Sequence, residues 1–257
     1  MRTCCLLVLA LLLGSSGCAG VYLPPMANVP ALRRAGQATA SASARVFAPQ
    51  HGTHAAAAVA ITDSLRVAGT VSSSFAKRRG IYGEGLLGAE PRLNRLLQLG
   101  VLGGVGYGDV DADHRRCRED EGSSDSFCLS PGNHVDQARA TYLRYSLQTY
   151  LTVYAPKIVH GGGGLRVSLL DMHLHEIDGL PVQRRALPVA LEPFAFVRVG
   201  APFFQAEVQL RYTGLMNDPR DQGHKVVVSD QFAFMVGIRT VFGPGIHPRW
   251  PRGWRYE

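Results

Sequence analysis

A period-two alternation of apolar and polar residues constrains the fold of this chain more than any other feature. From Leu143 to Val153, every second residue is apolar or threonine, and polar residues such as Arg144 and Gln148 lie between them. Residues 205–212 repeat the pattern. Alternation over this length predicts β-strands with two unlike faces.

The polar face carries charged residues, and this bears on the kind of sheet. A soluble sandwich buries its apolar face, whereas a barrel in a lipid bilayer is apolar outside and polar inside. The 257 residues suffice for one large barrel or two small domains. The low charged fraction of 18% fits a membrane barrel, but also a Gly-rich soluble β-protein. In the membrane register, the inward charged side chains are Arg144, Arg166, Arg198, Glu207, Arg211 and Arg239.

The lengths of the connections give a second indication. The alternation and the turn residues predict strands at 37–48, 53–62, 65–76, 80–89, 94–106, 138–154, 162–172, 188–199, 202–213 and 226–242. Every long connection, 107–137 and 173–187 included, is odd-numbered, and the even-numbered ones are short. Outer-membrane barrels have short periplasmic turns and longer extracellular loops. We therefore predict an all-β, antiparallel up-and-down barrel of about 10 strands (roughly 8–12) over residues 36–242.

The N-terminus has the pattern of an exported protein. A positive start and an apolar stretch over 1–17 predict a secretory signal peptide. Ser15-Ser16-Gly17-Cys18 resembles the bacterial lipobox, although Leu is usual at the position of Ser15. We expect lipidation at Cys18, the alternative being an ordinary signal peptide cleaved nearby. Residues 18–35, which lack periodicity and contain prolines, are predicted as a lipid-anchored tether, and 243–257 as a periplasmic tail.

Two further cysteines, Cys117 and Cys128, lie in one polar segment. In an oxidising compartment such a pair predicts a disulfide that closes a loop. A metal site there would need more ligands, and the spacing to His114 and His134 matches no zinc signature.

Short motifs also suggest a family. Cys18 followed by Tyr22-Leu-Pro-Pro, Asn28-Val-Pro and Gly36, and later Glu84-Gly85-Leu-Leu-Gly88, resembles a group of small outer-membrane β-barrel lipoproteins of Gram-negative bacteria. The resemblance implies a lipid-anchored outer-membrane barrel that uses the barrel-assembly and lipoprotein-sorting machinery. It implies no activity, because that group is mostly of undefined function.

The inward charges allow two interpretations. A barrel of this size has an interior nearly filled by side chains, so paired charges would plug it. An excess of Arg over Glu would alternatively line a narrow anion-preferring pore.

Candidate catalytic and metal residues are few. His173 and His175 could share one strand face, but no third ligand stands at a useful spacing, so a solvated pair at a loop edge is the simpler interpretation. Ser168, Ser229, His160 and His224 form no recognisable catalytic motif.

The sequence therefore predicts an outer-membrane β-barrel lipoprotein with a structural or surface-interaction role, outer-membrane lipid as a partner, and no assignable catalysis, cofactor, metal or nucleic acid. The net charge of +7 is spread between strands, which argues against a nucleic-acid surface. Two alternatives remain: a soluble periplasmic lipidated barrel that binds a small apolar ligand, and an acyl hydrolase with its site at the barrel rim. The oligomeric state is left open.

Overall fold

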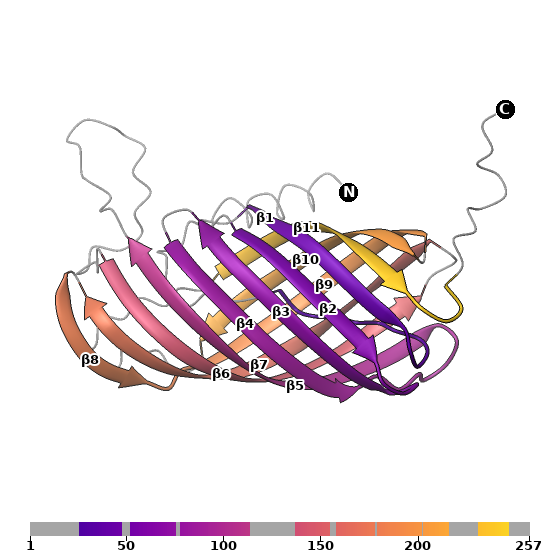
Figure 1. Ribbon diagram of the computed structural model, residues 1–257, viewed down its shortest axis with the longest axis horizontal. Helices are drawn as coiled ribbons and strands as arrows, with labels where there is room; N and C mark the ends of the chain where they lie inside the picture. The colour runs from indigo at the N-terminus through magenta and orange to yellow at the C-terminus, as the bar shows by residue number, and fades with distance from the viewer. Residues whose placement is uncertain are drawn as a thin grey trace, which may run out of the picture.

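The computed structural model describes residues 26–47, 52–75, 78–113, 137–154, 158–177, 179–201, 203–215 and 231–246 (Figure 1). The strands in this part of the chain are β1 (Ala38–Phe47), β2 (Gly52–Ala60), β3 (Leu65–Phe75), β4 (Arg78–Ala89), β5 (Leu97–Asp113), β6 (Gln137–Tyr154), β7 (Val159–Ile177), β8 (Leu180–Ala186), β9 (Val189–Ala201), β10 (Phe204–Leu215) and β11 (Gln231–Phe242). Within the described residues, no helix is long and apolar enough to cross a membrane.

The strands close into a barrel. Apart from β8, strands that follow one another in the sequence pair antiparallel, β7 pairs with β9, and β1 pairs with β11, so that ten of the described strands form a continuous ring. β8 pairs with β7 beyond the part of β7 that β9 uses, and it prolongs the wall at one end. The predicted closed antiparallel barrel is confirmed.

Several predicted boundaries were wrong in the same direction. β5 runs to Asp113, well into the segment predicted as loop 107–137. Most of the predicted loop 173–187 is instead the hairpin of β7 and β8. β7 begins at Val159, before the predicted strand 162–172, and within it Gly162 and Gly164 leave room for the rings of Phe196 and Phe194.

The outer surface of the ring is apolar. Alternate residues of each strand point outward, and the large ones among them are exposed: Val67, Ile81, Leu87, Val101, Val105, Leu143, Tyr145, Leu147, Leu151, Leu165, Val167, Leu169, Val197, Val208, Leu210, Val236 and Ile238. Ala and Gly fill much of the outward face of β1 to β4. We call this surface the apolar band. Residues 145, 147, 208 and 210, which decide between a membrane barrel and a soluble one, face outward.

The polarity of the wall reverses near one end of the barrel. On β7, outward Leu169 is followed by outward Asp171 and His173, while inward Ser168 is followed by inward Leu170 and Met172. The same reversal occurs on β5 and β6, where Asp109 and Arg139 face outward. The inward residues here form a buried cluster of Tyr82, Val110, Ala138, Ala140, Tyr142, Leu170, Met172, Leu174 and Ala190. We call residues 108–113, 137–142, 170–177 and β8 the extended wall.

Several predictions fall outside the described residues. They are the signal peptide, lipidation at Cys18, the disulfide between Cys117 and Cys128, the candidates Ser229 and His224, and the tail beyond residue 246.

Candidate functional site: the barrel lumen

The N-terminal segment 26–32, predicted as part of a tether, occupies the barrel lumen, and the exposed residues 33–35 follow it. Met26, Ala27, Asn28, Val29 and Leu32 are almost completely buried. Figure 1 shows a thin indigo segment before β1. Gly36, with a φ of 76°, lies two residues before the start of β1. We call residues 26–33 the lumen segment.

The lumen segment is held mainly through its backbone carbonyl oxygens. Arg166 donates to the oxygen of Met26 (3.1 Å), and Gln148 donates to that of Asn28 (2.7 Å). Both Arg198 (2.7 Å) and Arg239 (2.6 Å) donate to the oxygen of Val29. Further donors are Gln209 to Ala27 (3.2 Å), Arg239 to Pro30, Tyr154 to Ala31 (3.1 Å), Arg66 (2.7 Å) and Gln98 (2.9 Å) to Leu32, and Arg92 to Arg33. An extended chain without strand partners satisfies its polar groups in this way.

The backbone N–H groups of the segment are bound by two side chains of the wall. Ala27 donates to Gln209 (2.9 Å), while Ala31 (2.9 Å) and Leu32 (3.3 Å) donate to the two carboxylate oxygens of Glu90. Ala31 has a φ of 46°, a conformation that costs an L residue of this kind about 1–2 kcal/mol. The contacts of its N–H and carbonyl hold it there. Pro30 restricts Val29 to extended conformations, which suits a segment that runs along a barrel axis.

The six inward charges predicted from the sequence all lie buried in the lumen. Each carboxylate of the network has an arginine: Arg198 with Glu207 (2.7 Å), Arg66 with Glu90 (2.9 Å), Arg166 with Glu84 (3.9 Å), and Arg144 with Glu192. Sequence analysis missed Arg66 and Glu90 as members of this set. Arg66 and Glu90 stand at strand ends, where alternation is hardest to follow.

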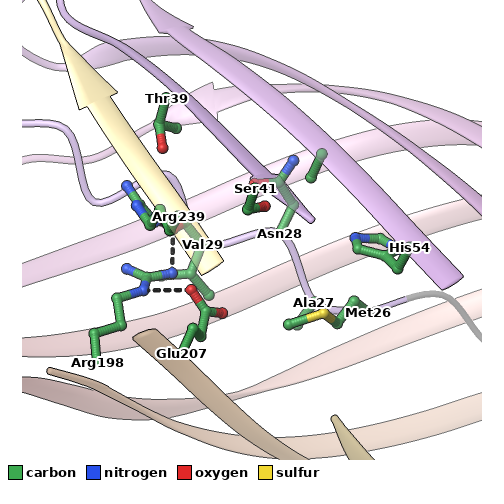
Figure 2. A pocket seen from close by; sticks show the side chains of 11 residues that line it. Met26, Ala27, Asn28, Val29, Thr39, Ser41, His54, Arg198, Glu207 and Arg239 are labelled. Atoms are coloured by element: carbon green, nitrogen blue, oxygen red, sulfur yellow. Dashed lines mark hydrogen bonds and ion pairs between the residues drawn. The ribbon is translucent and has the colours of Figure 1, made fainter. Parts of the chain in front are cut away.

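Figure 2 shows how tightly the lumen is packed around Val29. The guanidinium of Arg198 lies between Glu207 and the Val29 carbonyl, and Arg239 approaches the same segment from β11. The cavity that remains here, lined also by Met26 and His54, has a volume of about 10 Å³. That is room for about one water molecule. The described lumen is therefore closed by the lumen segment together with the charge network.

Glycines on β5 make space for large rings in the interior. A Cβ at Gly100 would lie 2.0 Å from the ring of Tyr150, and one at Gly108 would lie 2.3 Å from that of Tyr142. Tyr150 donates to Glu90, so the space at Gly100 also positions the carboxylate that binds the lumen segment.

The histidine and serine candidates lie apart from one another. His173 and His175 are on the outer face of the extended wall. His173 Nε2 lies 3.5 Å from Asp171 Oδ1, and His175 Nε2 lies 2.9 Å from Thr141 Oγ1. Ser168 accepts from Arg144, and the ring of His160 packs against Tyr154. No metal-binding group of three or more His, Cys, Asp or Glu residues occurs among the described residues.

Sequence analysis missed one serine–histidine pair. His54 Nδ1 and Ser72 Oγ are 2.7 Å apart on neighbouring strands β2 and β3. Both side chains are buried in the filled lumen, and the adjacent cavity of about 10 Å³ cannot admit an acyl chain. The pair therefore gives no support to the predicted rim site.

No protein-family model matches the sequence, and no curated protein matches it. Solved structures with a similar fold include the KdgM porin (8% identity, TM-score 0.39, covering 80% of this chain and 99% of that one) and the translocator domain of the autotransporter NalP from Neisseria meningitidis (12%, 0.38, 79% and 86%). The outer-membrane protease OmpT from Escherichia coli is also similar (10%, 0.37, 80% and 94%). Because these TM-scores are below 0.5, the assignment of a barrel is based on the strand pairing of the structure itself.

Proposed function

We propose that this chain is an outer-membrane β-barrel lipoprotein with a closed lumen, whose role is structural or the presentation of a surface outside the membrane. The observation that carries this proposal is the reversal of wall polarity at Leu169 and Leu170. On the side of residues 165–169, the barrel is apolar outside and charged inside, as expected in lipid. On the side of residues 170–177, the extended wall is charged outside and apolar inside, as expected in water.

The apolar band weighs against the soluble alternative. Exposed Leu147, Val167 and Leu210 belong to a surface that continues around the ring. Soluble monomers rarely expose contiguous apolar patches larger than a few hundred Å². The lumen is also occupied by charged side chains and the lumen segment, and the cavity beside Met26 and His54 is too small for an apolar ligand.

The polar outer face of the extended wall supports a surface role. Asp171 accepts two hydrogen bonds from Arg185, both 2.7 Å, on the side away from the barrel interior. Charged pairs of this kind hold the β7–β8 hairpin in an aqueous environment. Strands of this wall include parts of the segments 107–137 and 173–187, which the lengths of the connections predict on the extracellular side.

Fractionation tests the membrane assignment. We expect the protein in the outer-membrane fraction, with a gel mobility that changes on heating. Recovery in the periplasmic fraction without detergent would contradict it. Lipidation is tested separately by incorporation of labelled palmitate, which we expect Cys18→Ala to abolish.

Cysteine labelling tests the orientation, in a background where Cys117 and Cys128 are replaced by Ser. We expect His173→Cys on the extended wall to react with a membrane-impermeant maleimide on intact cells. Arg95→Cys, in the connection between β4 and β5, is the matched control and should react only after the outer membrane is permeabilised. The opposite result would reverse the topology.

A further inference from the structure

The lumen segment fills the barrel in a way that points to a removable plug. It belongs to no strand of the barrel, and most of its described hydrogen bonds join its backbone to side chains of the wall. The ring of ten strands closes through β1 and β11 without it. The wall is therefore complete whether or not the segment is in place.

The charges that surround the segment are unequal in number. Among the described residues, the buried charged side chains of the lumen are six arginines, Arg66, Arg144, Arg166, Arg198, Arg211 and Arg239, and four glutamates, Glu84, Glu90, Glu192 and Glu207. Positive charge therefore exceeds negative charge in a low-dielectric interior, where an uncompensated charge is costly.

The carbonyl oxygens of the lumen segment accept from this arginine-rich wall. Met26, Val29, Pro30 and Leu32 each accept from at least one guanidinium. A carbonyl oxygen carries partial negative charge, so the segment stands where anions would otherwise bind. Its extended backbone also takes up a path along the barrel axis that ions could follow in its absence.

From these observations we propose that residues 26–33 act as an internal plug, and that the barrel without this plug is an anion-selective channel. The proposal rests on the membrane location proposed above. The transported class is small inorganic or carboxylate anions, because rings of arginine favour anions in pores. Glu90 is the main anchor of the plug, since both of its oxygens accept from the segment while Arg66 and Tyr150 hold it in place.

The test is current through a planar bilayer that contains the refolded protein and a gradient of potassium chloride. We expect the full chain to be closed. Deletion of residues 26–32 should give a steady conductance, with a reversal potential shifted toward that of chloride. Adding Arg198→Gln and Arg239→Gln to the deletion should reduce this shift.

Insertion is measured first, by heat-modifiable mobility and by protection in vesicles. A chain that fails to insert contradicts the proposed membrane function. A deletion variant that inserts but carries no current, or prefers potassium, overturns the plug proposal alone. A full chain that conducts as well as the deletion variant also overturns it.

A second variant decides the matter if the deletion prevents folding. Glu90→Gln in the full chain removes the charged acceptor of Ala31 and Leu32, so we expect intermittent chloride-selective openings. The matched control is Asp171→Asn, which removes a carboxylate from the outer face of the extended wall and should leave the channel closed. An inserted Glu90→Gln variant that stays closed overturns the proposal.

Discussion

Along β7, the segment 165–169 and the segment 170–177 share one period and have opposite polarity. In the first, Leu165 and Val167 point outward while Arg166 and Ser168 point inward. In the second, the apolar residues point inward and Asp171 points outward. The strand geometry is unchanged, so the difference reflects the solvent outside the wall. In the proposed membrane location, a bilayer would favour the first arrangement and water the second.

The largest expected contrast between the two regions is the loss of unfolding free energy when an ion pair is broken. Glu192→Gln leaves Arg144 in the closed lumen without its carboxylate, and breaking a buried pair costs about 3–5 kcal/mol. Arg185→Ala breaks the exposed pair with Asp171 on the extended wall, which water screens, so we expect little change. Urea unfolding in detergent micelles measures both. Equal losses would mean that the lumen is wet and the comparison does not hold.

Two adjacent leucines test the point of reversal. Leu170 is 0% exposed in the apolar cluster of the extended wall, whereas Leu169 is 42% exposed on the outer face. Leu170→Ala should cost about 2–5 kcal/mol because it leaves a cavity. Leu169→Ala should cost clearly less. A larger loss for Leu169→Ala, measured by the same unfolding experiment, would place the boundary of the core elsewhere.

The third comparison places an arginine at an outward position of β7 in each of the two regions. Val167→Arg puts a charge on the lipid face, which costs about 2–4 kcal/mol near the bilayer midplane. His173→Arg puts it on the same strand and face, beside Asp171 in water, and should be tolerated. The yield of heat-modifiable folded protein distinguishes them. Similar yields would remove the inside–outside assignment.

The predicted disulfide adds the smallest effect. Closing the short loop between Cys117 and Cys128 should contribute about 2–3 kcal/mol by restricting the unfolded chain. Labelling of the non-reduced protein with a thiol reagent should leave both cysteines unmodified, and prior reduction should expose them. Modification of both without reduction would show that the bond is absent.

Much of the barrel could be predicted because alternation and turn residues are local signals. The inward positions of Arg144, Arg166, Arg198, Glu207, Arg211 and Arg239 follow from strand parity alone. Residues 108–113 and 173–186 of the extended wall were predicted as loops because the apolar and polar faces change places near there, beginning at the adjacent apolar residues Leu169 and Leu170 on β7. A prediction from alternation that assumes the same solvent along the whole strand loses the signal where the two faces change places.

The lumen segment had no local signal of its own. Residues 26–32 carry no charge and include Pro30, a composition that is typical of a linker. Their burial depends on partners such as Glu90, Arg198 and Arg239, far away in sequence. The excess of arginine over glutamate was visible in the sequence, but it was interpreted as the lining of a possible anion-preferring pore and not as a binding surface for residues 26–33.

Spin-label accessibility along the outer face of β7 tests the central claim most directly. Single cysteines at 165, 167, 169, 173 and 175, in a background with Cys117 and Cys128 replaced, would carry the label in protein refolded into vesicles. We predict that labels up to 169 collide mainly with oxygen dissolved in lipid, and that labels at 173 and 175 collide mainly with a water-soluble nickel complex. A constant ratio of the two along the strand would contradict the account, because the polarity reversal would then mark no bilayer boundary.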